Sequence, residues 1–112
     1  MLVSIKENAV FRRLYYRGKT AGNRYLVIYC SRNRLGVNRF GFTVSTKLGH
    51  AVVRNRTRRR LREICRVHNP LLKEGYDIVV VARSAAVEAP FSCLTDAYLT
   101  LIEKLSLRRD AE

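Results

Sequence analysis

Residues 39–63 read RFGFTVSTKLGHAVVRNRTRRRLRE, and their hydrophobic periodicity changes part-way along. In residues 39–45, large apolar side chains alternate with small or polar ones, which predicts a β-strand. One face of this strand is too small to fill a core and suits the floor of an open groove. From residue 51 to residue 67 the inward-facing side chains recur with helical spacing, which predicts a helix. The members of this inward stripe are Val53, Thr57, Leu61, Ile64 and Cys65.

The segments on either side predict further elements. Asn8 can cap a first helix that Gly18 ends. Residues 25–30 and 77–82 have the composition of strands, and the second is a continuous apolar run typical of burial on both faces. Pro90 begins a last helix that extends to about residue 107 and carries a clear apolar stripe.

The strand at residues 25–30 has two apolar faces. Tyr25, Val27 and Tyr29 share one face, and the alternate residues form the other. Either both faces are buried or one of them is a surface on which rings can stack. The alternation does not choose between these two interpretations.

Together these elements predict a single-domain α+β protein, an α/β sandwich. The predicted order is helix, strand, strand, helix, strand, helix, and an extra short strand near residues 20–23 is left open. A chain of 112 residues is the usual size of one domain, so residues 1–112 are assigned to one unit.

The charge balance points to a polyanionic partner. Lys and Arg total 22 against 9 Asp and Glu, which gives a formal net charge of +13. Self-repulsion of this size destabilises a compact state unless a polyanion offsets it. Arginine outnumbers lysine, and its planar guanidinium suits phosphates and base edges, so nucleic acid is favoured over a membrane surface.

Cysteine usage and hydropathy indicate the compartment. The three cysteines are widely spaced and form no C-x-x-C pair, so we expect small buried hydrophobic residues in a reducing environment. The first residues have no signal-peptide pattern, and no run reaches the length of a membrane span. We therefore expect a soluble cytoplasmic protein with no membrane partner.

The predicted helix at residues 51–67 concentrates the positive charge. Seven arginines occupy residues 54–66, with Glu63 as the only acid among them. Like charges at i,i+4 destabilise an isolated helix by a few tenths of a kcal/mol per pair. A face that carries this cost with so little compensation predicts an anionic partner rather than a merely solvated surface.

At this helix the chain resembles the bacterial ribonuclease P protein component. In that family a strand ends in a Ser-x-Lys-x-Gly turn, which leads into Ala-Val-x-Arg-Asn-Arg and a basic helix. The matching residues here are Ser45, Lys47, Gly49, Ala51, Val52, Arg54, Asn55 and Arg56. The likeness continues in family order through FRRLYYRGK, NRYLVIY and DIVVVAR and covers nearly the whole chain. His50 and Thr46 depart from the family, since Asn and a basic residue are frequent at those positions, and the role of His50 is left open.

The resemblance implies two RNA-binding surfaces. One is a cleft for the single-stranded 5′ leader of precursor tRNA, lined by Phe11, Tyr15, Val27, Tyr29 and Thr43. The other is a basic surface that faces a catalytic RNA, formed by Lys47, Arg54, Asn55, Arg56, Arg58, Arg59 and Arg62. The resemblance also implies a left-handed strand–helix–strand crossover, although a right-handed one is the general rule.

The implied function is that of the protein subunit of ribonuclease P, an endoribonuclease whose catalysis resides in the RNA subunit. Mg²⁺ is then the cofactor and is held mainly by the RNA, so no catalytic residue and no metal ligand are assigned, with Asn55 a candidate contact through water. The expected partners are the catalytic RNA and precursor tRNA, with no obligate protein partner.

The alternatives are a non-catalytic RNA-binding protein or RNA chaperone, a DNA-binding domain and a protein-only nuclease. The DNA-binding alternative is disfavoured because a strand, rather than a second helix, precedes the basic helix. The protein-only nuclease is disfavoured because the acidic residues are few and scattered.

Overall fold

The computed structural model describes residues 2–110 and contains one five-stranded sheet and three α-helices. The strands are β1 (Val3–Ser4), β2 (Lys19–Gly22), β3 (Leu26–Arg32), β4 (Arg39–Thr43) and β5 (Tyr76–Ala82). The helices are α1 (Asn8–Arg17), α2 (Ala51–His68) and α3 (Phe91–Lys104). The strand order across the sheet is β1-β4-β5-β3-β2, in which β5 runs parallel to β4 and antiparallel to β3.

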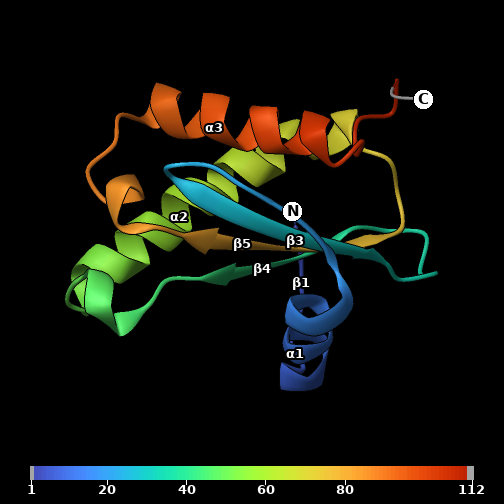
Figure 1. Ribbon diagram of the computed structural model, residues 1–112, viewed down its shortest axis with the longest axis horizontal. Coiled ribbons are helices and arrows are strands. Elements are labelled where there is room, and N and C mark those ends of the chain that lie inside the picture. The colour runs from blue at the N-terminus through green and yellow to red at the C-terminus, as the bar shows by residue number, and fades with distance from the viewer. Residues whose placement is uncertain (1, 111–112) are drawn as a thin grey trace.

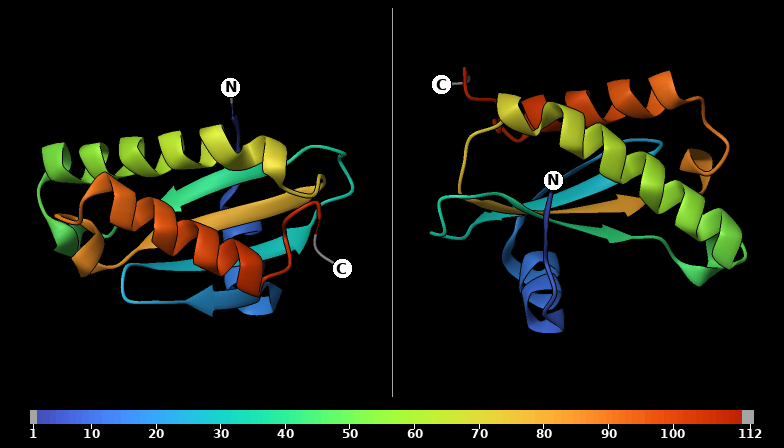
Figure 2. Two further views of the ribbon diagram at one scale, coloured as in Figure 1. Left: turned by 90° about the horizontal axis from the view of Figure 1, so that it is seen from above. Right: turned by 180° about the vertical axis from the view of Figure 1, so that it is seen from behind.

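The sheet is covered unequally on its two faces. Helices α2 and α3 lie side by side over one face, and α1 alone lies against the other (Figures 1 and 2). The larger core fills the space under α2 and α3, where Phe40, Ile64 and Tyr98 are fully buried. A smaller core under α1 contains Leu14 and Val79. The α/β sandwich expected from the sequence is confirmed.

The β4-α2-β5 unit is left-handed. In the left-hand view of Figure 2, α2 and α3 lie on the near side of the sheet. When that view is turned so that the parallel strands β4 and β5 point upward, β5 lies to the left of β4. The chain therefore moves to the left as it passes from β4 through the nearer α2 to β5, which defines a left-handed crossover. This agrees with the crossover that the family resemblance implies, against the general preference for the opposite hand.

Several element boundaries differ from those expected. Helix α1 starts at Asn8 itself, and Glu7 occupies the capping position without a side-chain hydrogen bond, so the capping role predicted for Asn8 is wrong. Helix α3 ends at Lys104 rather than near residue 107, because Ser106 adopts a left-handed conformation with φ of 57°. Phe91 is 46% exposed and does not belong to the buried stripe of α3.

The sheet contains two strands, β1 and β2, in addition to the three in the predicted order of elements. Strand β2 covers residues 19–22 and confirms the short strand left open near residues 20–23. Strand β1 has only two residues and pairs with the edge of β4. Its formation depends on a partner far along the chain, so no local periodicity could indicate it.

The described residues show neither a membrane-spanning helix nor a metal-ligand cluster. No helix within residues 2–110 is both long and apolar enough to cross a bilayer. Over the same residues, no three His, Cys, Asp or Glu side chains come together as a group that could hold a metal ion. Cys30 and Cys65 are buried as free thiols, as expected, whereas Cys93 is only half-buried.

Candidate nucleic-acid interface

Helix α1 brings aromatic side chains onto the otherwise open face of the sheet. Its buried residues Val10 and Leu14 hold it against β5, and Phe11 packs directly over Gly41 of β4. An ideal Cβ at Gly41 would clash with the Phe11 ring, so the missing side chain allows the close approach. The small face predicted for residues 39–45 thus receives a ring from another element.

Tyr15 connects α1 to β4 and β3, the strands on either side of β5. Its hydroxyl lies 2.6 Å from Oγ1 of Thr43 in β4. Its ring meets Tyr29 of β3 edge-on with centroids 5.0 Å apart, and the Phe11 ring lies 6.4 Å away. The Tyr15 side chain nevertheless remains 40% exposed, so this aromatic arrangement opens to solvent.

The two faces of β3 differ in burial, which decides between the two earlier interpretations. Leu26, Ile28 and Cys30 are completely buried under α2 and α3. Val27 and Tyr29 on the opposite face are only half-buried. One face therefore belongs to the core, and the other is an accessible surface.

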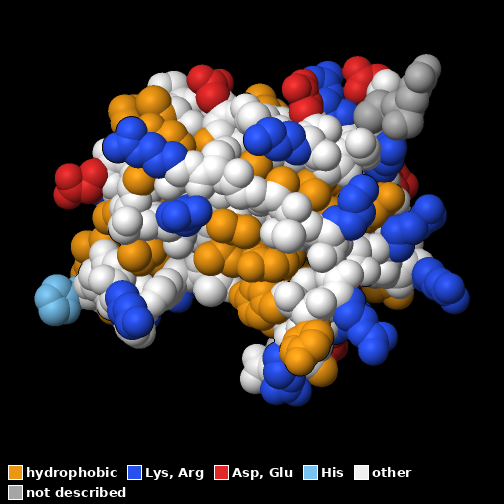
Figure 3. All heavy atoms as spheres, in the orientation of Figure 1, with side chains coloured by type: hydrophobic (Ala, Val, Ile, Leu, Met, Phe, Trp, Pro, Cys, Tyr) orange, Lys and Arg blue, Asp and Glu red, His pale blue; other side chains and the backbone are white. Residues whose placement is uncertain are grey.

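The structure gathers the five residues predicted for the leader cleft onto one face of the sheet. We call this set the aromatic patch: Phe11, Tyr15, Val27, Tyr29 and Thr43. Figure 3 shows hydrophobic side chains exposed beside α1, along the sheet, with Lys and Arg side chains around them. The patch has the open, ring-lined and cation-bordered character that single-stranded nucleic acid needs.

Helix α2 buries four of the five residues of the predicted apolar stripe, leaves Val53 half-buried and turns most of its arginines outward. Thr57, Leu61, Ile64 and Cys65 are buried, and the Thr57 hydroxyl donates to the Val53 carbonyl at 2.9 Å. The residues on the opposite side are exposed. They are Asn55, Arg56, Arg59 and Arg62, with Arg54 and Arg58 half-exposed beside them.

Local contacts orient part of this surface. Arg54 Nε donates to the Gly49 carbonyl at 3.2 Å, and Arg58 Nη1 donates to Asn55 Oδ1 at 3.0 Å. The Arg62 guanidinium lies 5.2 Å from the centre of the Phe42 ring. These contacts hold the charged groups without neutralising them, so they remain available to an anion.

Two arginines of α2 are instead engaged within the protein. Arg60 donates to the carbonyls of Val87 and Ala89, and burial, aided by repulsion from Arg56, lowers its pKa. Arg66 pairs with Glu63 at 2.5 Å. Arg59 and Arg60 point to different sides of α2, because adjacent residues of a helix are about 100° apart, and the 84–90 segment supplies its carbonyls on the Arg60 side.

The turn between β4 and α2 joins the two surfaces. Ser45 accepts a hydrogen bond from the Lys47 backbone N–H at 3.1 Å and leaves the Lys47 side chain exposed. Gly49 follows with φ of 147°, and an ideal Cβ there would lie 3.0 Å from Val53. His50 takes the N-cap position of α2 without a side-chain hydrogen bond and is exposed. Strand β4 thus carries Thr43 of the aromatic patch and leads within a few residues to the arginine surface.

A buried ion pair under α1 was not anticipated from the sequence. Arg39 Nε and Nη2 donate to the two Asp77 carboxylate oxygens at 2.8 Å each, and Asn33 donates to Oδ1 at 2.9 Å. Burial opposes ionisation of Asp77, but the hydrogen bonds from Arg39 and Asn33 outweigh it and lower the pKa. Arg39 is the first residue of β4 and Asp77 the second of β5, and opposite charges near the start of two parallel strands are the signal that could have revealed the pair.

Comparisons with known proteins agree with the geometry. A family model described as Ribonuclease P matches residues 2–106. The "Ribonuclease P protein component" of Caldanaerobacter subterraneus subsp. tengcongensis is 43% identical over 99% of this chain and 96% of the relative. The RNase P protein of Staphylococcus aureus superposes with a TM-score of 0.87 at 32% identity, covering 97% of this chain and all of that one.

A second solved structure gives the same result. The RNase P protein from Thermotoga maritima superposes with a TM-score of 0.83 at 28% identity over 90% of this chain and 96% of that one. A family match over nearly the full length, a 43% identical relative and the same fold agree with the motif in the turn and helix after β4. The chain therefore belongs to the ribonuclease P protein component family.

Proposed function

We propose that this protein is the subunit of ribonuclease P that binds both the catalytic RNA and the 5′ leader of precursor tRNA. In this role it assists the endonucleolytic removal of the leader. As a ribonuclease P protein component it is part of an endoribonuclease. The observation that carries the proposal is that a single domain presents two surfaces suited to RNA, which meet at β4.

The aromatic patch suits the leader because it can bind an unpaired strand without reading its sequence. Every base has a π face, and stacking on an aromatic side chain contributes about 1–3 kcal/mol per base. Tyr15 offers a partly exposed ring whose orientation is fixed by Thr43 and Tyr29. A duplex would keep its bases stacked internally and gain little from such a surface, so the patch favours the single-stranded leader over the body of tRNA.

The arginine surface of α2 suits a structured RNA. Its arginines and the lysine of the preceding turn offer guanidinium and ammonium groups to phosphates. They are the outward Arg56, Arg59 and Arg62, the half-exposed Arg54 and Arg58, and Lys47. Neutralising phosphates releases condensed counterions, which provides affinity independent of sequence. The Asn55 amide adds no charge, so its contribution is a hydrogen bond to RNA or to a metal-bound water.

In this proposal the chemical step belongs to the RNA subunit, and Mg²⁺ is held mainly there. The protein supplies positive charge where leader and catalytic RNA approach each other, and its net charge of +13 supports that role. It then lowers the Mg²⁺ concentration that cleavage requires and strengthens precursor binding, rather than accelerating bond cleavage itself. No obligate protein partner is needed, and the site of action is the cytoplasm.

The test is reconstitution with the catalytic RNA of the same organism at low Mg²⁺. We expect the double variant Arg54→Ala and Arg56→Ala to weaken assembly with the catalytic RNA. The double variant Phe11→Ala and Tyr15→Ala should weaken binding of precursor tRNA while leaving that of mature tRNA unchanged. Equal losses for the two substrates would contradict the assignment of the leader to the aromatic patch.

The principal alternative is a basic RNA-binding protein or RNA chaperone without a role in cleavage. It predicts that the protein binds the catalytic RNA and precursor tRNA but leaves the rate of leader removal unchanged. A rate increase at low Mg²⁺ that depends on the aromatic patch separates the two functions. Cleavage by the purified protein without any RNA would instead support a protein-only nuclease.

A further inference from the structure

The outward face of α1 carries an aromatic side chain that has no packing role. Tyr16 is 91% exposed, whereas its neighbour Tyr15 lies in the aromatic patch on another side of the helix. Arg12, Arg13 and Arg17 surround Tyr16 and line a shallow hollow of about 430 Å³ with it. Among residues 2–110, no acidic side chain lines this hollow.

A second cationic hollow adjoins the first. It also measures about 430 Å³ and is lined by Lys19 of β2, Arg32 of β3 and Lys73 of the loop before β5. Arg17 lines both hollows, so they form one continuous surface. The second hollow has hydroxyl groups from serines and a tyrosine in its lining, and no carboxylate from the residues that the structure describes.

This surface is separate from the arginines of α2. Lys19 and Arg32 belong to β2 and β3, which form one side of the sheet, whereas α2 packs over β4 towards the other. Figure 3 shows Lys and Arg side chains beside α1 and further up along the same side of the molecule. The Lys and Arg side chains of the two hollows are therefore not part of the α2 surface proposed to bind the catalytic RNA.

The charge of this surface is almost unopposed within the protein. Arg13 approaches Asp77, but at 3.9 Å and with the Asp77 carboxylate already satisfied by Arg39. Five further cations, Arg12, Arg17, Lys19, Arg32 and Lys73, line the two hollows, and no acidic residue of the described part of the chain lines them. Such clustering destabilises the free protein and becomes favourable only when a polyanion is bound.

We propose that these residues form a second binding surface for single-stranded RNA, which takes leader nucleotides beyond those on the aromatic patch. We call it the outer α1 surface and define it by Arg12, Arg13, Tyr16, Arg17, Lys19, Arg32 and Lys73. The inference rests on the proposed function, because it extends the path of the same strand. Tyr15 and Tyr16 are adjacent in sequence, so a strand that leaves the aromatic patch and passes around α1 reaches Tyr16 directly.

The chemistry of the outer α1 surface favours an unpaired strand over a duplex. An exposed tyrosine among arginines offers a stacking partner that only an unpaired base can use. The neighbouring hollow, with Lys19, Arg32 and Lys73, offers several donors to phosphate oxygens. One base on Tyr16 with its flanking phosphates on the cations is a consistent arrangement.

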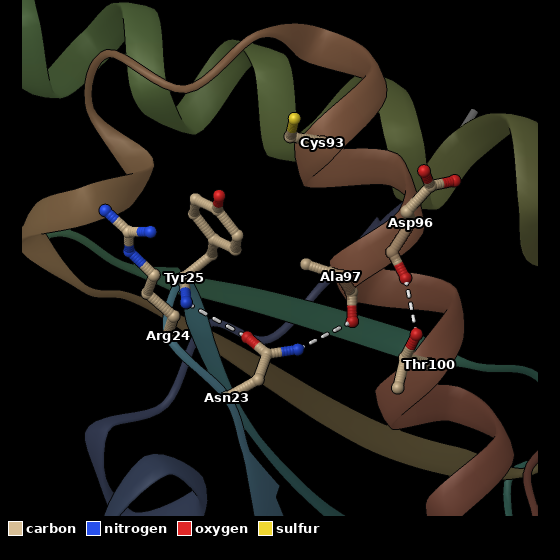
Figure 4. Close-up of a pocket in the computed structure, with 7 residues that line it drawn as sticks. All are labelled: Asn23, Arg24, Tyr25, Cys93, Asp96, Ala97 and Thr100. Atoms are coloured by element: carbon tan, nitrogen blue, oxygen red, sulfur yellow. Dashed lines mark hydrogen bonds between the residues drawn. The ribbon is translucent and has the colours of Figure 1, made fainter.

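A third hollow, shown in Figure 4, has a different character. Asn23, Arg24, Tyr25 and Asp96 are among its lining residues, and the Asn23 side chain donates to the Ala97 carbonyl at 3.1 Å. Its acidic lining residue and this internal hydrogen bond indicate a structural contact between the β2–β3 turn and α3. Arg24 lies beside the Tyr25 ring at 5.6 Å and is exposed, so Arg24→Gln is a matched control for loss of a surface arginine next to a tyrosine.

The experiment measures binding of precursor tRNA to the holoenzyme as the leader is lengthened one nucleotide at a time. Tyr16→Ala and the double variant Arg17→Gln and Lys19→Gln are compared with wild type and with Arg24→Gln. We expect no change for short leaders and, for extended leaders, a loss of about 5- to 150-fold for Tyr16→Ala, which corresponds to one stacked base. The double variant should also flatten the salt dependence by about 0.7 in log–log slope per lost phosphate contact.

Two results would overturn the inference. One is that Tyr16→Ala and the double variant behave like Arg24→Gln at every leader length. The other is an equal loss for mature tRNA or for assembly with the catalytic RNA, which would assign the surface to a different part of the complex. If Phe11→Ala with Tyr15→Ala still separates precursor from mature tRNA, the proposed function stands while this extension fails.

Discussion

The Tyr15 side chain combines two interactions that substitution can separate. Its hydroxyl shares a hydrogen bond with Thr43, and its ring provides the exposed stacking surface. We expect Tyr15→Phe to retain most of the affinity for precursor tRNA, because the ring remains. Tyr15→Ala should lose about 1–3 kcal/mol of binding free energy. Equilibrium binding of precursor and mature tRNA by both variants tests this, and equal losses in the two variants would show that the hydroxyl, rather than the ring, contacts RNA.

Asp77 is the residue at which stability and pH are linked. Its side chain is 1% exposed and accepts hydrogen bonds from Arg39 and Asn33. Asp77→Asn should lower the free energy of unfolding by about 3 kcal/mol, since it leaves Arg39 without its charged partner. Denaturant unfolding at neutral pH measures this loss, and Asp110→Asn at an exposed position provides the control.

The pH dependence follows from the direction of the Asp77 shift. Because its folded-state pKa lies below the ordinary value, the stabilisation is present above the unfolded-state pKa of about 3.9 and is lost as the pH falls through the lower folded-state value. The stability of wild type should therefore decline more steeply below about pH 4 than that of Asp77→Asn. Parallel declines in the two proteins would contradict this role.

At the level of elements, the contact of α1 with the sheet depends on Gly41. An added methyl group would clash with the Phe11 ring, so Gly41→Ala should destabilise the protein by about 1–3 kcal/mol and displace the ring from the aromatic patch. Replacing the Phe11 ring with the smaller leucine side chain in the Gly41→Ala background should relieve the clash and restore part of the lost stability. A double-mutant cycle measured by thermal unfolding tests the pairing, and strict additivity would argue against it.

Helix α2 provides a matched pair of arginines with opposite expected phenotypes. Arg60 donates to two carbonyls of the segment before α3, whereas Arg59 is exposed. Arg60→Ala should lower stability by about 1–3 kcal/mol, because buried acceptors lose a charged donor. Arg59→Ala should leave stability unchanged and weaken binding to the catalytic RNA. Unfolding and RNA-binding measurements on both variants test this, and the reverse pattern would show that α2 faces the RNA differently.

At the scale of the whole molecule, the net charge of +13 should govern assembly. If six to ten phosphates are neutralised, affinity for the catalytic RNA should fall by roughly 10³–10⁵ between about 50 and 200 mM salt. Titrations at several salt concentrations measure the slope. A nearly flat dependence would contradict the arginine surface of α2 as the principal contact with the catalytic RNA.

The sequence determined the features that depend on neighbouring residues. The alternation in β3, the stripe Thr57, Leu61, Ile64 and Cys65 of α2, and the order of the main elements all follow from local periodicity, which reports directly which side of an element is apolar. The residues of the aromatic patch and the left-handed crossover came from the family resemblance, because periodicity cannot say which surface of one element covers another.

Only the tertiary structure decided the features that join distant segments. The two-residue strand β1, the Tyr15–Thr43 hydrogen bond and the Arg39–Asp77 pair each require segments that are remote in sequence to meet. The separate roles of Arg59 and Arg60 have the same origin. Both lie on α2 and point about 100° apart, but only the folded chain places carbonyl groups beside Arg60 and solvent beside Arg59.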